Sequence, residues 1–199
     1  STWNVSTVSD MWHLFEGASS FEGDLSNWDV SSAVTISGMF RFASAFNGDI
    51  STWNVSNVSD MWHLFEGASS FEGDLSNWDV SSVVNMEAMF QNTPFNGSVG
   101  SWNVSAVSTM KLMFSDAINF DQNLSSWNVS SVTDFSDMFN NTPELSDDNK
   151  CLIHNSWNSN AYWPYFDWES ICGYISCKPT NLSVAIGENE NVLSWNEPG

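Results

Sequence analysis

Basic residues are scarce in this sequence. Lysine and arginine together number 4, against 24 aspartates and glutamates, and the formal net charge at pH 7 is −20. A surface that binds nucleic acid needs a basic face to neutralise phosphates, so this composition excludes that class of partner. Anionic membrane surfaces are disfavoured for the same reason. An acidic chain instead suits divalent cations, cationic partners or high solubility, and solubility is the most common reason.

Long apolar runs and catalytic motifs are also missing. No stretch of about twenty consecutive apolar residues occurs, so no insertion into a membrane is expected. No secretory signal is visible at Ser1. The sequence shows no Ser-His-Asp arrangement, Gly-rich phosphate loop or paired histidine ligands. We therefore expect no enzymatic activity and no cofactor.

What the sequence does contain is a repeat of about 25 residues. Residues 1–32 recur as residues 51–82 with one difference, Asn57 in place of Thr7. A fixed period of this size predicts stacked repeats, each burying its apolar side against its neighbours. Coils one to six begin near the tryptophans that mark the period, Trp3, Trp28, Trp53, Trp78, Trp102 and Trp127. We expect these indoles to form one buried column and a phenylalanine of each coil to form a second, Phe15, Phe40, Phe65, Phe90, Phe114 and Phe139.

Each repeat has two halves with different periodicity. Trp28 and Val30 alternate with polar residues, which predicts a short strand. The apolar spacing of three and four residues through Val58, Met61, Leu64, Phe65 and Ala68 predicts a helical segment. The predicted fold of residues 1–150 is therefore an α/β solenoid like a leucine-rich repeat, with six coils of about 25 residues, a parallel strand ladder and a C-terminal cap.

The repeat also resembles a known family. Units that read Trp-Asn-Val-Ser-x-Val-Ser-Asp-Met are similar to the BspA-like leucine-rich repeats of microbial surface proteins. The resemblance covers about residues 1–150 and implies a surface protein that offers an interaction face. The first coil lacks a polar cap, so we expect its outer face to be covered, for example by another subunit.

The repeat pattern stops after coil six. Residues 151–177 contain all three cysteines, and the Cys-x2-Cys spacing of a zinc site is absent. We predict an aromatic cap with a disulfide between Cys151 and Cys172, which leaves Cys177 unassigned. A disulfide implies an oxidising compartment, and hence an extracellular or cell-surface location. Residues 178–199 resemble the first strands of a fibronectin type III module, present either as the start of that module or as strands that pair with another subunit.

Polar residues of the predicted strands are candidate binding groups. We expect them on the concave face, where they would contact a protein or a glycan: Asn27, Asp29, Asn54, Asn77, Asp79, Asn103 and Asn128. Asn-x-Ser/Thr sequons make a further set of asparagines candidates for N-glycosylation: Asn4, Asn54, Asn57, Asn96, Asn103, Asn123, Asn128, Asn140 and Asn181. The alternative is a polar strand face that carries no sugar.

A second row of acidic residues lies at the predicted turns. Asp24, Asp49 and Asp74 supply oxygen atoms of the kind that calcium prefers, which makes them weak calcium candidates. No coil offers the six to eight oxygens of a dedicated calcium loop.

Taken together, these patterns predict a non-catalytic extracellular surface or matrix protein, and its repeat array would make it a candidate filament subunit or homo-oligomer. The alternative is a monomeric adhesin that binds a protein or glycan on the concave face.

Overall fold

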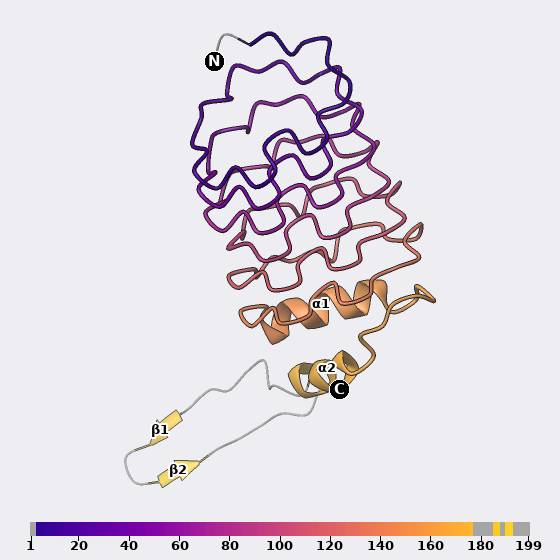
Figure 1. The fold of residues 1–199 in the computed structure, drawn as a ribbon. Coiled ribbons are helices and arrows are strands. Elements are labelled where there is room, and N and C mark those ends of the chain that lie inside the picture. Colours follow the sequence, from indigo (N-terminus) through magenta and orange to yellow (C-terminus); the bar gives the residue numbers. More distant parts are fainter. Residues whose placement is uncertain (1–2, 177–184, 188–189, 193–199) are drawn as a thin grey trace.

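The computed structural model describes residues 3–176, 185–187 and 190–192. Residues 3–146 wind as a stack of coils, and two helices follow the last coil: α1 (Asp147–Trp157) and α2 (Trp168–Ser176) (Figure 1). Two short strands, β1 (Ala185–Gly187) and β2 (Glu190–Val192), pair antiparallel with Ala185 opposite Val192. The remainder of the fibronectin-like segment, and the filament contact expected from it, lie outside the described residues.

The predicted α/β leucine-rich-repeat fold with a parallel strand ladder is wrong. Across residues 3–146 the coils contain neither a helix nor a sheet. The strand-like pairings between neighbouring coils are isolated parallel bridges, each involving one residue per coil: Asp10 with Thr35, Thr35 with Asp60, Asp60 with Asn85, Asn85 with Thr109, and Thr109 with Asp134. The coils are built from consecutive turns instead.

Side-chain hydrogen bonds explain why the Trp-x-Val segments are not strands. The Asp29 carboxylate accepts hydrogen bonds from the backbone N–H of Ser31 at 3.1 Å and from its hydroxyl at 2.6 Å. An aspartate that binds the backbone two residues on bends the chain and occupies an N–H that a strand ladder would need. The period-two pattern therefore comes from a turn whose flanking residues still point inward.

Backbone dihedral angles explain why the second half of each repeat is not helical. His63 has φ of 52° and Gly67 has φ of 67°, in the left-handed region that an α-helix cannot contain. The Leu64 N–H donates to the carbonyl of Met61, three residues back, while the N–H of His63 donates to Glu87 in the next coil at 2.9 Å. These turns place apolar residues at the same spacing of three and four as a helix would.

The core prediction holds although the backbone prediction fails. The five residues from Val58 to Ala68 that were expected to face inward are fully buried. Phenylalanine rings of successive coils stack with centroids 5.6–5.9 Å apart, and the indoles of Trp28 to Trp127 are buried. Trp3 differs from the expectation, because it lies at the end of the stack and is 66% exposed.

The helices cap the other end of the stack. Ser146 accepts a hydrogen bond from the N–H of Asn149 and so caps α1, whose Trp157 ring stacks on Trp127 at 6.1 Å and extends the indole column. The predicted boundary at residue 150 therefore lies inside α1. The Phe139 N–H donates to the Tyr165 hydroxyl at 2.8 Å, which satisfies a backbone donor of the last coil.

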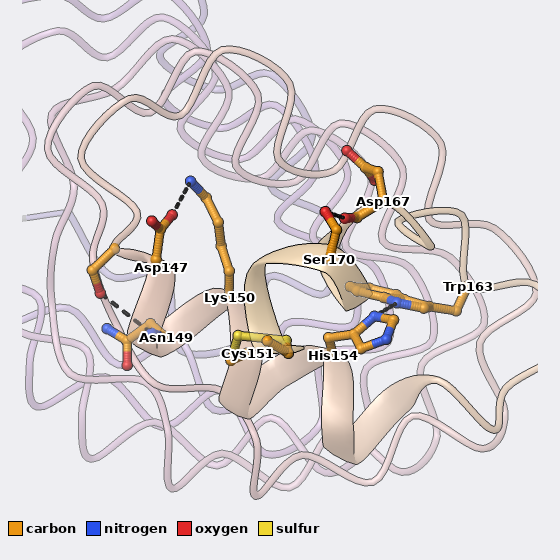
Figure 2. Close-up of a disulfide and its surroundings, with 10 residues drawn as sticks. Asp147, Asn149, Lys150, Cys151, His154, Trp163, Asp167 and Ser170 are labelled. Carbon is orange, nitrogen blue, oxygen red and sulfur yellow. Dashed lines mark hydrogen bonds and ion pairs between the residues drawn. A yellow bond between two sulfur atoms is a disulfide. The ribbon is translucent and has the colours of Figure 1, made fainter. Parts of the chain in front are cut away.

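A disulfide joins the two helices of the cap. Cys151 of α1 and Cys172 of α2 are bonded, the pairing expected from the sequence, with their Cα atoms 5.1 Å apart (Figure 2). In the same view the Trp163 indole lies against His154, to which it donates a hydrogen bond of 3.2 Å. His154 is buried, so its imidazole is a fixed acceptor inside the cap. Cys177 lies outside the described residues.

Candidate functional site

The row of residues predicted to line a concave strand face is a row of exposed turns. Asn54 and Asn103 each accept hydrogen bonds from the N–H and the hydroxyl of the serine two residues on, as Asp29 does. Asp79 and Asn128 accept from the N–H of Ser81 and Ser130. Asn27 and Asn77 are exposed beside these turns. The side-chain oxygens of this row are therefore largely used to shape the backbone.

The same geometry accounts for the sequons at the turns. The side-chain oxygen of Asn4 accepts hydrogen bonds from the N–H and the hydroxyl of Ser6, as the side-chain oxygen of Asn54 does from Ser56. Because Asp29 makes the same two bonds, the Asn-x-Ser pattern serves the turn whether or not sugar is attached. We therefore expect these asparagines to be needed for their side-chain oxygen, which aspartate supplies equally well.

The remaining sequons are placed differently. The Asn57 side-chain amide donates to the carbonyl of Ser31, and the Asn96 oxygen accepts from the N–H of Asp121. Asn123 forms a turn with Ser125, and Asn140 is exposed and accepts from the N–H of Asp116 through its backbone carbonyl. Asn181 lies outside the described residues.

The calcium candidates do not form a cation site. Asp24, Asp49 and Asp74 each bind the serine two residues on, and these hydrogen bonds hold the pKa of each carboxyl below its ordinary value. In the part of the chain that the structure describes, no three histidine, cysteine or acidic side chains converge in a way that could hold a metal ion.

A different surface gathers the side chains best suited to binding. We call it the aromatic surface and define it by Trp12, His13, Arg41, Phe42 and Trp62. The His13 ring lies edge-on to Trp12, with centroids 4.3 Å apart, and 6.2 Å from Trp62. Arg41 lies over the ring of Phe42 at 4.7 Å. Trp12 is 61% exposed and Phe42 is 45% exposed, whereas Trp62 is partly buried, so coils one and two present aromatic rings to solvent.

Glycines of the turns make room for these rings. A Cβ atom on Gly38 would lie 2.9 Å from Nε2 of His13, and one on Gly67 would overlap the ring of Phe42. Both glycines also have positive φ, so they serve the turn and the packing together. Phe42 itself has φ of 56°, an uncommon conformation for a bulky residue, and its N–H is held by the carbonyl of Glu66 at 2.7 Å.

A network of ion pairs links the coils that carry the aromatic surface. Arg41 donates through Nε to Glu66 at 2.6 Å and through Nη1 to Glu16 at 3.2 Å, so it joins three coils. His13 pairs with Glu16, and His63 pairs with Glu66. Burial alone would raise the pKa of the Glu66 carboxyl, but hydrogen bonds from His63 and Arg41, together with their charges, outweigh burial and lower it.

The comparison with known families places the chain. A family model described as a Mycoplasma protein of unknown function, DUF285, matches residues 1–94 and, a second time, residues 73–163. The chain belongs to this family. Neither the curated proteins nor the solved structures contain a match. The DUF285 match does not bear on the resemblance to BspA-like repeats or to fibronectin type III modules, and both stay predictions.

The described basic side chains of this DUF285 chain are all paired internally. Lys111 donates to Glu87 at 3.0 Å, Lys150 pairs with Asp147 at 3.4 Å, and Arg41 pairs as described above. Within the described residues, no helix combines the length and apolar character that crossing a membrane requires. The surface offered to a partner is therefore acidic, and the aromatic surface is one of the places where rings are exposed on it.

Sequence reasoning missed the aromatic surface for an identifiable reason. His13, His63 and Trp12 lie outside the apolar spacing that predicts the core, so the sequence pattern does not place them. The available signal was Arg41, the only arginine, which falls between two nearly identical units that each carry Trp-His and Glu-Gly. A spacing of 25 residues on either side places Glu16 and Glu66 next to it.

Proposed function

We propose that this DUF285 chain is a non-catalytic extracellular interaction module that binds a basic protein through the aromatic surface. The observation that carries the proposal is the exposure of Trp12 and Phe42 on a rigid stack, beside an arginine fixed by two carboxylates. Tryptophan, arginine and other large side chains dominate the energetics of protein interfaces when they are clustered and well supported.

Rigidity supports this role. Arg41, Glu16 and Glu66 lock the coils below the rings, and Gly38 and Gly67 seat the rings against the neighbouring backbone. A partner therefore meets side chains that are already ordered, and the entropy cost of binding is reduced. Exposed apolar patches supported in this way are typical of interaction sites.

Charge favours a basic partner. The network itself sets two carboxylates against one guanidinium and two imidazoles, so the preference for a basic partner comes from the rest of the chain. The formal charge of the whole chain is −20, and its described lysines and arginine are neutralised by its own acids. Such a surface attracts cationic proteins, and lysine or arginine side chains of a partner can lie over the exposed indole rings.

The cap supports an extracellular location. A disulfide closing the end of a stack persists in an oxidising environment and is uncommon in a reducing cytosol. The module would then act at a cell surface or in a matrix.

Selection of random displayed peptides on the immobilised chain tests the proposal. Enriched peptides should be rich in lysine and arginine, and their affinity should fall as ionic strength rises. Trp12→Ala should weaken binding about tenfold or more, because truncation of a central aromatic residue commonly costs over 1 kcal/mol.

Ile118→Ala is the matched control, since Ile118 is 54% exposed but lies in coil five, away from the aromatic surface. Acidic or unchanged consensus peptides, or equal binding by Trp12→Ala, would contradict the proposal. So would a selection that enriches no peptide.

A further inference from the structure

A cleft of about 510 Å³ lies between coil six and the cap. One wall is the turn of coil six that contains Asn128 and Ser130, and the other is the end of α1 with the following loop, including Ser159, Asn160 and Tyr162. In coils one to five the equivalent turn lies on the open side of the stack. After coil six the chain continues into α1 and its loop instead of another coil, and these form the second wall.

Hydrogen bonds hold the two walls in place. The Asn160 side-chain amide donates to the carbonyls of Val129 at 2.8 Å and Val132 at 3.0 Å. Its oxygen accepts from the N–H of Tyr162 at 2.8 Å, and the Ser156 hydroxyl donates to the carbonyl of Ser125 at 2.6 Å. The cleft is therefore formed before any ligand arrives, and its volume lies in the range typical of small-ligand sites.

The side chains that line the cleft are all uncharged, although the chain is strongly acidic. The amide nitrogen of Asn128 and the hydroxyls of Ser130 and Ser159 enter no hydrogen bond within the described residues, so they are available to a ligand. The Tyr162 ring is 59% exposed and offers an apolar face with a hydroxyl at its edge. Hydroxyl and amide groups beside an exposed ring match a ligand that has many hydroxyls on one side and C–H groups on the other.

We propose that this cleft binds a neutral carbohydrate. An anionic sugar would meet no basic side chain there and would be repelled by the acidic chain, and a cationic ligand would find no carboxylate in the lining. The site is separate from the aromatic surface of coils one to three and does not depend on it.

The repeat itself supplies a conservative test. Asp29 and Asp79 occupy in coils two and four the position of Asn128, and they accept the same serine N–H. Asn128→Asp therefore keeps the turn, while it removes the amide donor from the cleft and introduces a negative charge. Asn103→Asp makes the same change in coil five, outside the cleft, and is the matched control.

The experiment is an array of neutral and sialylated glycans probed with the chain, followed by calorimetric titration of the best neutral trisaccharide. Neutral glycans should bind, and Asn128→Asp and Tyr162→Ala should each weaken binding at least about fivefold, as expected for loss of one hydrogen bond or contact. Asn103→Asp should bind like the parent. Binding of sialylated glycans only, of no glycan, or equal binding by Asn128→Asp and the parent overturns the proposal, and so does equal weakening by the control.

Discussion

Removing one indole from the buried column should destabilise the whole stack. Trp78 is 3% exposed, and its ring stacks on Trp53 with centroids 6.5 Å apart and packs against Phe65. Its indole N–H donates to the carbonyl of Ile50 at 3.1 Å. Trp78→Ala therefore removes a large ring from a site surrounded on both sides by other coils, and takes from that carbonyl one of its two donors, the other being the N–H of Trp53.

The magnitude follows from these contacts. Truncating a buried tryptophan to alanine costs about 3–5 kcal/mol, and the walls of this site cannot collapse freely because each belongs to a stacked coil. For a chain of this length, each kcal/mol lowers the melting temperature by about 2–4 °C, so a fall of roughly 6–20 °C is expected. Since coils stabilise one another, coils three to five should all lose protection together.

Thermal and urea unfolding followed by circular dichroism measure the loss of stability, and hydrogen exchange shows which coils lose protection. Trp3→Ala is the control, because Trp3 occupies the same repeat position but is 66% exposed at the end of the stack. Its cost should be about 1 kcal/mol or less. If Trp78→Ala unfolded at the same urea concentration as the parent, the buried indole column would not be a source of stability.

Two further predictions concern the cap and the charged network. Reduction of the Cys151–Cys172 bond, which closes a separation of 21 residues, should lower the stability of the cap by about 3 kcal/mol. Hydrogen exchange should therefore become faster in α1 and α2 before it does so in the coils. Equal protection with and without reductant would contradict this. Glu66→Gln should lower the free energy of unfolding by about 1–3 kcal/mol at pH 7. The folded pKa of Glu66 lies below its ordinary 4.5, so the ionised form stabilises the fold above that pH and this stability is lost as pH falls through the folded value. The difference between variant and parent should therefore shrink in acid, and a constant difference from pH 7 to pH 3 would refute the assignment.

The sequence predicts which residues are buried better than it predicts the backbone that buries them. The period of about 25 residues and the inward set from Val58 to Ala68 depend only on where apolar side chains recur, and these residues are buried as expected. The cap disulfide follows from the positions of the cysteines beyond the end of the repeat.

The backbone conformation could not be predicted in the same way, because an α-helix and a run of turns can give the same spacing of apolar residues. Apolar residues three and four apart fit an α-helix, and they fit equally a run of turns with positive φ at His13 or at Asp137. At other coils the same position holds Ala88 and Leu112, residue types that seldom adopt positive φ, so the sequence gave no consistent signal for these turns. Bonds to the next coil, such as that from the N–H of His13 to the carbonyl of Ser37 at 3.0 Å, hold the conformation. That stabilisation comes from stacking and is invisible in one repeat.

Nearly identical repeats could pair in the wrong order as the chain folds. The packing of the His13 ring on Gly38 and of the Phe42 ring on Gly67 disfavours such pairing. Because residues 1–32 and 51–82 differ at one position, a folding chain could pair coil one with the wrong neighbour and skip a coil. His13 fits above Gly38, whereas a skipped coil would place it above His63. Phe42 fits above Gly67, but pairing with coil four would place it above Asn92. A misregistered stack would thus set side chain against side chain at these two positions, which disfavours that pairing of the coils.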